Sequence, residues 1–126
     1  MDKKLFREEI VKLLYSSNIN DKLNLSEYTK EIQNEFLAVK ANLSEIDEII
    51  KTNLENWNID RLNYVDLAII RYAVYELVFL NHPKEIVINE AVELTKKYSN
   101  LDDDKAKKFN NRLLQNIVDD IGDKDA

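Results

Sequence analysis

Basic side chains stand close to aromatic rings near both ends of the 126-residue chain. Tyr15 follows a basic N-terminal stretch, and Phe109 follows the lysine-rich stretch 105–108. The N-terminal basic residues, which lie on successive turns if the segment is helical, are Lys3, Lys4 and Arg7. Positive charges attract phosphates, and flat rings stack on unpaired bases, so this pattern is typical of a surface for single-stranded RNA. The other interpretation is that Tyr15 and Phe109 are ordinary core aromatics.

The formal net charge of −6 argues against indiscriminate nucleic-acid binding. The charge is unevenly spread, because acids dominate residues 26–56 while residues 1–15 and 96–112 hold an excess of cations. This asymmetry fits one surface for a polyanion on an otherwise acidic protein. Solvated helix faces with no binding role explain the same distribution.

The residue types needed for most catalytic and metal sites are missing. The chain has no Cys and a single histidine, His82, which excludes disulfides, thiolate metal sites and multi-histidine sites. His82 precedes Pro83, where we expect a solvated turn or a capping role. With Gly122 as the only glycine, no Gly-rich phosphate loop is present. The acidic run 102–104 lacks the spacing of a calcium loop and is expected to cap the last helix. We therefore predict no catalytic residues, no metal and no cofactor.

The elements that must position these residues are predicted to be helices throughout. One Gly and one Pro in 126 residues are too few for a β-sandwich or barrel, which needs turn residues every roughly 8 to 12 positions. A hydrophobic content of 44% is enough for one core. We predict an all-α fold, a single compact bundle of about six or seven helices formed by residues 1–126 as one domain. No apolar run is long enough for a membrane span, and the N-terminus lacks the pattern of a signal peptide, which favours a cytoplasmic protein without membrane contact.

Apolar periodicity and capping residues give expected helix boundaries. The fourth helix, 64–81, is apolar on nearly every side and is expected to be the central one. Ser26 is expected to cap the second helix, Ser44 with Asp47 the third, and Asn63 with Asp66 the fourth. The helices are predicted over 3–17, from Ser26, from Ser44, over 64–81, over 88–98 and around 109–121.

Two further expectations concern individual side chains. Arg71 lies on the apolar central helix and needs an acidic partner, for which Glu90 or Glu93 of the next helix is expected. Asn89 is expected to cap its own helix. Trp57 is expected to continue the buried stripe of the third helix.

The stretch 62–94 resembles the NusB family of transcription antitermination factors. The run after the Pro-containing turn is especially specific and reads Ile88-Asn89-Glu90-Ala91-Val92-Glu93-Leu94. The preceding pattern is Val65-Asp66-x-Ala68-Ile69-x-Arg71-x-Ala73-x-Tyr75-Glu76-Leu77. The basic start and the Leu14-Tyr15 pair also fit, so the resemblance covers about half of the chain in detail.

The resemblance implies an all-helical bundle that binds boxA-type RNA of ribosomal RNA operons. In this family, binding occurs together with a ribosomal small-subunit protein acting as NusE, and the complex joins RNA polymerase and suppresses premature termination. Asp66 would face the ribosomal protein. The RNA-binding residues would be Lys3, Lys4, Arg7, Tyr15 and Phe109.

Two departures from the family pattern bear on RNA binding. The N-terminal arm offers two Lys and one Arg instead of an Arg-rich run, and Lys lacks the planar fork of Arg. The glycine that the family places shortly after its late Phe is replaced, since the segment reads Phe109-Asn110-Asn111-Arg112. An alternative function is therefore a NusB-fold protein-interaction module with weak or lost RNA binding. Self-association as a homodimer also stays open, and an enzyme is not expected.

Overall fold

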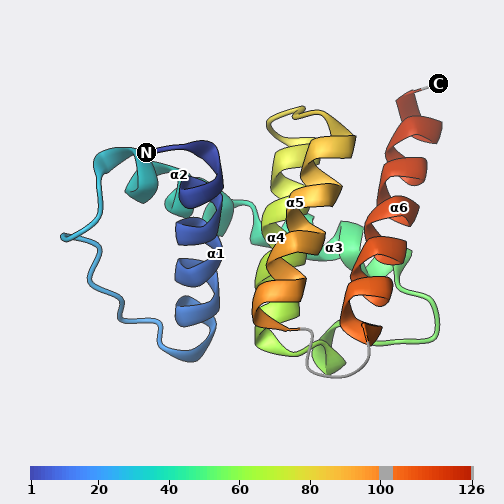
Figure 1. Cartoon of the computed structure of the whole chain (residues 1–126), viewed down its shortest axis with the longest axis horizontal. Coiled ribbons are helices and arrows are strands. Elements are labelled where there is room, and N and C mark those ends of the chain that lie inside the picture. The colour runs from blue at the N-terminus through green and yellow to red at the C-terminus, as the bar shows by residue number, and fades with distance from the viewer. Residues whose placement is uncertain (100–103, 126) are drawn as a thin grey trace.

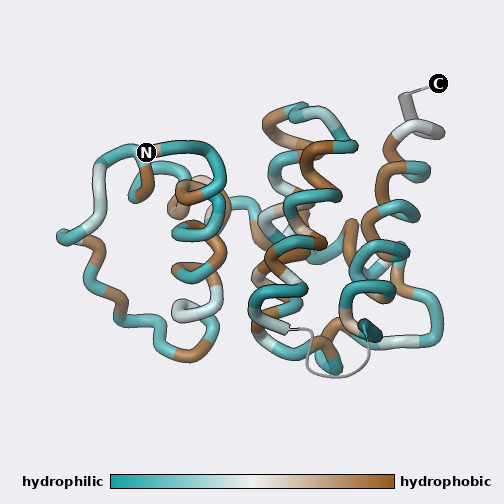
Figure 2. Tube along the Cα trace, in the orientation of Figure 1, coloured by the Kyte–Doolittle hydropathy of each residue, from teal (hydrophilic) through white to brown (hydrophobic). Residues whose placement is uncertain are grey.

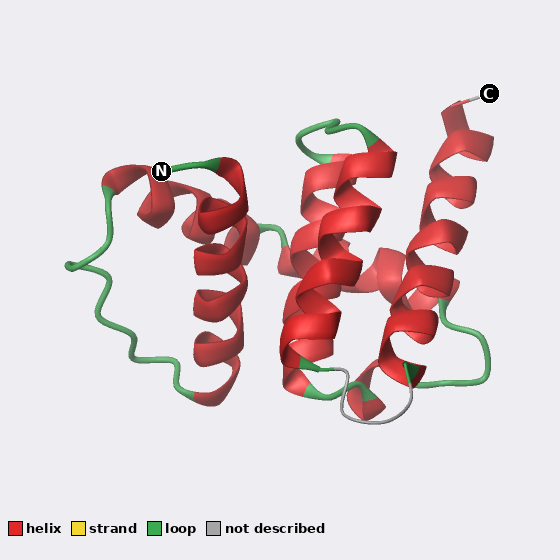
Figure 3. Ribbon diagram, in the orientation of Figure 1, coloured by secondary structure: helices red, strands yellow, loops and turns green. Residues whose placement is uncertain are grey.

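In the computed structural model, which describes residues 1–99 and 104–125, the chain forms six α-helices and one short 3-10 helix (Figures 1 and 3). No strand occurs in these two ranges. The predicted all-α fold is thus confirmed. In chain order the elements are α1 (Lys3–Ile19), α2 (Lys30–Ala41), α3 (Leu43–Asn53), η1 (Ile59–Arg61), α4 (Tyr64–Val78), α5 (Lys84–Tyr98) and α6 (Lys105–Asp125).

Helix α4 is the centre of the bundle, as its apolar sequence predicted. It packs against α1 on one side, against α5 and α6 on the other, and against α3. Figure 1 shows α1 and α2 at one end of the long axis and α6 at the other, with α4 and α5 between them. Eleven of the 15 residues of α4 are buried. Of the described helices, none has the length and apolar content that crossing a bilayer would require.

One cluster of buried apolar side chains runs through all six α-helices. Figure 2 shows apolar and polar residues alternating along α1, α5 and α6, as expected for helices with one buried face. Removing these side chains from water is the main favourable contribution to folding. Representative members from the successive α-helices, each 3 % exposed or less, are Ile10, Ile32, Ile46, Ile70, Val87 and Leu114.

The helix starts agree only in part with the predicted caps. The cap on α4 is confirmed, because the Asn63 side chain accepts a hydrogen bond from the Asp66 backbone N–H at 2.8 Å. Helix α2 is instead capped by Thr29, which follows a short turn, so Ser26 was the wrong residue. Helix α3 begins directly after α2, with Asn42 as its first flanking residue, so the predicted Ser44 cap is also wrong.

The α4–α5 connection begins earlier and ends earlier than the sequence predicted. Helix α4 ends at Val78 because Asn81 adopts a left-handed conformation (φ 52°), which takes the chain away from the helix axis. Helix α5 then begins at Lys84, directly after Pro83, whose missing N–H costs nothing at a helix start. Asn89 therefore lies inside α5, and the expectation that it caps this helix is wrong.

Arg71 is paired as expected, but with another partner. Its guanidinium donates two hydrogen bonds to the Asp47 carboxylate, at 2.9 and 2.8 Å, and so joins α4 to α3. The predicted partners, Glu90 and Glu93, lie on α5, whereas Arg71 points to α3. The predicted cap at 102–104 falls mainly on residues outside the described ranges.

Candidate nucleic-acid interface

Three of the predicted RNA-binding residues lie on the surface of α1. Lys3 and Lys4 are exposed in its first turn, which Asp2 caps by accepting the Leu5 backbone N–H at 2.8 Å. Tyr15 lies near the other end of the helix and is 37 % exposed. The charges and the ring are therefore accessible, and they are separated along the helix by about three turns.

Arg7 is not on this surface, which corrects the sequence expectation. It is 6 % exposed, and its guanidinium donates two hydrogen bonds to Glu76 of α4, at 2.8 and 2.7 Å. Burial by itself lowers the pKa of Arg7, but the hydrogen bonds and the charge of Glu76 outweigh it and raise the pKa. The Arg7 charge is neutralised inside the bundle, where a phosphate has no access to it.

Glu76 has a second partner that the sequence did not indicate. The His82 Nδ1 atom lies 3.1 Å from a Glu76 carboxylate oxygen, and the His82 backbone N–H donates to the Glu76 carbonyl at 3.0 Å. His82 is half-buried, so the expectation of a solvated turn histidine is only partly right. Arg7, Glu76 and His82 together fasten α1 to the end of α4.

Asp66 is also internal, contrary to the expectation that it faces a protein partner. It is 7 % exposed, and one of its carboxylate oxygens accepts hydrogen bonds from the Ser99 hydroxyl (2.6 Å) and the Asn110 amide (3.0 Å). The same amide donates to Thr95 Oγ1 at 3.0 Å. Asp66 belongs to α4, Thr95 and Ser99 to α5 and its end, and Asn110 to α6, so the network holds three helices together. Most of Asp66 is therefore covered by the bundle itself.

Phe109 lies near the start of α6, where it is partly buried against the core and borders Trp57. The two ring centroids are 6.2 Å apart with an interplanar angle of 63°, an edge-to-face arrangement. Trp57 is 44 % exposed, which corrects the expectation that it continues the buried stripe of α3. The Arg61 guanidinium lies 5.5 Å from the Trp57 ring centroid.

Trp57 and Arg61 were missed by the sequence reasoning, although a signal was present. Trp57 stands between Asn56 and Asn58 in a polar stretch that has no helical apolar period. A large aromatic residue in such a stretch, beside an arginine, is more typical of a surface than of a core.

Three helix ends that carry aromatic residues lie at one end of the molecule. In Figure 1, the last turns of α1 and α5 and the first turns of α6 lie together at the lower end, with α5 between the other two. Tyr15, which is exposed, and Phe109, which is partly buried, are therefore carried by helices on either side of the α4–α5 pair, and the exposed Tyr98 lies at the end of α5. We call this region the aromatic end. Its rings are Tyr15, Tyr98, Phe109 and Trp57.

A polar contact at the aromatic end ties α5 to α1. The Lys97 ammonium lies 2.8 Å from a Glu8 carboxylate oxygen, and the Tyr98 hydroxyl donates to the same oxygen. These two hydrogen bonds, with the charge of Lys97, hold the pKa of Glu8 below its ordinary value. The same contact raises the pKa of Lys97.

The arrangement offers chemistry for binding a polyanion that carries flat bases. Exposed lysines of α1 and α6 supply positive charge, and the aromatic end supplies stacking surfaces. In the described ranges, no group of three or more His, Asp or Glu side chains is placed to hold a metal ion.

Comparison with known proteins places these features in a family. Residues 3–119 match the model of the NusB family. A transcription antitermination protein NusB from Listeria innocua is 38% identical over 128 residues, covering 94% of this chain and 97% of the relative. One from Clostridium botulinum is 39% identical over 134 residues, covering 94% of this chain and 98% of the relative.

Two solved structures share the fold. T. maritima NusB superimposes with a TM-score of 0.79 at 29% identity, covering 94% of this chain and 92% of the other. A chain from the crystal structure of a plectonemic RNA supercoil superimposes with a TM-score of 0.80 at 30% identity, covering 94% and 95%.

Proposed function

The chain belongs to the NusB family, and from this premise we propose that it is an RNA-binding transcription antitermination factor. It binds single-stranded boxA-type RNA of ribosomal RNA operons together with the ribosomal small-subunit protein acting as NusE. The complex then acts on RNA polymerase, and the role is regulatory rather than enzymatic. The names of the relatives support the antitermination role, and the RNA supercoil structure supports a link between this fold and RNA.

The observation that carries the RNA-binding part is the presence of exposed rings beside exposed cations on one protein of net charge −6. Phosphates would be held by Lys3 and Lys4 and by the lysines at the start of α6, and bases would stack at the aromatic end. Because Arg7 is neutralised by Glu76, fewer cations are available than the sequence indicated. We therefore expect weak binding by the protein alone and tighter binding with the ribosomal protein, which would add its own contacts to the RNA.

The test is fluorescence anisotropy of a labelled boxA-type RNA, titrated with the protein at several salt concentrations, with and without the ribosomal protein. For single strands the slope of log affinity against log salt is about −0.7 for each neutralised phosphate. The Lys3→Ala/Lys4→Ala double variant should therefore flatten the slope by about 1.4. The matched control is Lys30→Ala/Lys40→Ala, which removes two exposed lysines from α2 and should leave the slope unchanged.

An unchanged slope in the Lys3→Ala/Lys4→Ala variant would remove these lysines from the interface. If the wild-type protein binds the ribosomal protein but adds nothing to RNA affinity, the chain is instead a NusB-fold protein-interaction module. The acidic net charge and the internal position of Arg7 are the observations that favour this second function.

A further inference from the structure

Trp57, which is outside the predicted RNA-binding set, forms an aromatic pair with Phe109, which belongs to that set. The segment between α3 and η1 carries Trp57, and α6 carries Phe109, so the pair joins two parts of the chain more than 50 residues apart. Nearly half of the Trp57 surface is open to solvent. Burying an aromatic ring in the core would remove a large apolar area from water. Here the core lies under Phe109, and Trp57 stays outside it.

Two hollows border this pair. One, of about 350 Å³, is lined by both rings together with Arg61 and Lys105. The other, of about 260 Å³, is lined by Phe109 but not by Trp57. The volumes of both hollows are near or below the lower end of the roughly 300–1,000 Å³ that small-molecule sites occupy. Hollows of this size can hold one part of a longer ligand, such as a single base.

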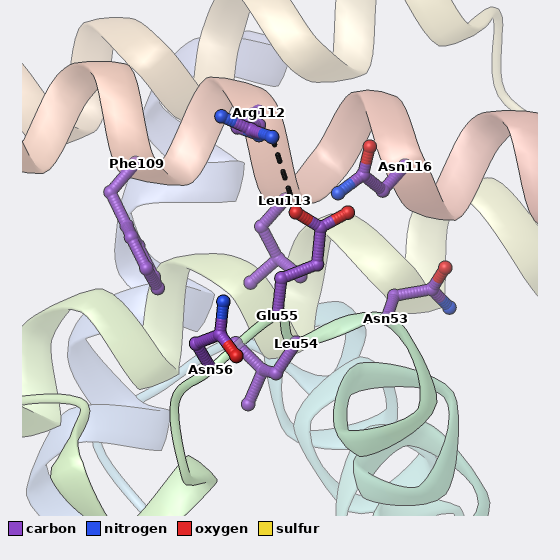
Figure 4. Close-up of a pocket in the computed structure, with 8 residues that line it drawn as sticks. All are labelled: Asn53, Leu54, Glu55, Asn56, Phe109, Arg112, Leu113 and Asn116. Atoms are coloured by element: carbon purple, nitrogen blue, oxygen red, sulfur yellow. Dashed lines mark hydrogen bonds and ion pairs between the residues drawn. The ribbon is translucent and has the colours of Figure 1, made fainter.

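The second hollow is lined by amides and an ion pair. Figure 4 shows Phe109 extending from α6 towards the segment that carries Asn56, with the ion pair of Arg112 and Glu55 beside it. The ion pair joins two exposed side chains at 3.1 Å and is therefore weak and easily exchanged. Within the described residues, the side-chain amides of Asn56 and Asn116 have no hydrogen-bond partner. Such amides match the donors and acceptors on the edge of an unpaired base.

The charge around the pair is suited to a polyanion. Arg61, Lys105 and Arg112 are exposed cations around the two rings. Of the acids that line the hollows, Asp66 is occupied by Ser99 and Asn110, and Glu55 is paired with Arg112. Phosphates that follow a stacked base would thus meet guanidinium and ammonium groups.

We infer that Trp57 and Phe109, flanked by Arg61, Arg112 and the Asn56 amide, form a site for one or two unstacked bases of single-stranded RNA. The site extends the RNA surface from α6 onto the segment between α3 and η1. This inference rests on the proposed function, since it names where part of the same RNA would bind.

The test uses Trp57 as its own reporter, because it is the only tryptophan in the chain. Single-stranded boxA-type RNA added to the protein alone at low salt should quench the Trp57 fluorescence, since a stacked base contacts the indole. Duplex RNA of the same sequence should quench much less, because its bases are not available for stacking.

Affinity measurements by RNA anisotropy complete the test. Trp57→Ala should weaken binding of single-stranded RNA roughly tenfold or more, the effect of losing one stacked base. Trp57→Phe, which keeps a ring, should recover much of this loss, and Arg61→Ala should flatten the salt slope by about 0.7. The matched controls are Leu37→Ala and Lys40→Ala on α2, which remove an exposed apolar side chain and an exposed charge and should change nothing. Thermal melting followed by circular dichroism checks that each variant is folded.

The outcomes separate the two proposals. If RNA binds while Trp57 fluorescence stays constant and Trp57→Ala binds as well as the wild type, the base site is wrong and the proposed function stands. Equal quenching by duplex RNA would show that phosphates alone perturb Trp57, which also overturns the base site. If the wild-type protein binds no RNA, with or without the ribosomal protein, the proposed function fails and the base site fails with it.

Discussion

Arg7 of α1 donates two hydrogen bonds to the Glu76 carboxylate of α4, and both side chains are nearly closed to water. The planar fork of a guanidinium matches both oxygens of a carboxylate, which a lysine ammonium cannot do. The two hydrogen bonds to both oxygens of Glu76 therefore give a structural reason for an arginine, rather than a lysine, at position 7. The two charges compensate each other inside the bundle, and removing one of them leaves the other buried without a partner.

We expect Arg7→Ala to lower the free energy of unfolding by about 3–5 kcal/mol, the cost of breaking a buried ion pair. Chemical denaturation followed by circular dichroism measures this change. Lys4→Ala, an exposed substitution on the same helix, serves as the control and should lie within about 0.5 kcal/mol of the wild type. If Arg7→Ala had wild-type stability but weaker RNA binding, Arg7 would be part of the RNA-binding surface rather than a structural residue.

At the scale of the helices, Glu8 links α1 to the end of α5 through Lys97 and Tyr98. The hydrogen bond from Lys97 is the main cause that lowers the pKa of Glu8 from its ordinary 4.5, followed by the one from Tyr98. A carboxyl whose pKa is lower in the folded state stabilises the protein at pH values above its ordinary pKa. That stabilisation is lost as the pH falls through the pKa of the folded state.

Glu8→Gln should therefore be modestly less stable than the wild type at neutral pH. The difference should shrink as the pH falls through the lowered pKa of Glu8 and vanish below it, where both proteins carry an uncharged side chain at this position. Melting temperatures measured across this pH range test it, with Glu45→Gln, an exposed carboxylate near the start of α3, as the control. A difference between Glu8→Gln and wild type that is independent of pH would show that the carboxylate charge is not what links the helices.

At the scale of the whole molecule, a single cluster of buried side chains reaches from α2 at one end to α6 at the other. Trp57 lies at the α6 side, next to Phe109, whereas Ile32 of α2 is buried at the other end of the long axis. If residues 1–126 form one cooperative domain, as the sequence predicted, a change at Ile32 must alter the unfolding that Trp57 reports.

We expect Ile32→Val to lower the free energy of unfolding by about 0.5–1.5 kcal/mol. The shift should be identical whether unfolding is followed by Trp57 fluorescence or by circular dichroism. Leu37→Ala, on the exposed face of the same helix, provides the control and should shift neither signal appreciably. Two separate transitions, with only the circular dichroism signal moved by Ile32→Val, would show that the two ends unfold independently.

The arrangement of the whole molecule also limits the path of a bound strand. The helices that carry Tyr15 and Phe109 are separated by the α4–α5 pair, so a strand that touches both rings must pass over the end of α5. Tyr98 and Lys97 lie on that path. The continuation beyond Phe109 leads to Trp57.

The sequence by itself determined the helical class, the central place of α4 and the Asn63 cap. These features depend on composition and on neighbours along the chain. The scarcity of Gly and Pro gives the helical class, the apolar content of 64–78 gives the central helix, and the Asn63 side chain accepts the backbone N–H of the residue three positions later. The run Ile88–Leu94 was likewise enough to identify the family. The first turns of α2, α3 and α5 were less predictable, because Ser, Thr, Asn and Pro nearby compete as starting residues.

Only the tertiary structure decided which charged and aromatic side chains are accessible. Arg7 and Lys4 look alike in sequence, yet one meets Glu76, 69 residues away, and the other meets water. Asp66 is bound by residues of two later helices, and Trp57 is placed on the surface by a turn without periodicity. The physical reason is that burial of a charge depends on a partner brought near by folding, and the spacing along one helix carries no information about that partner.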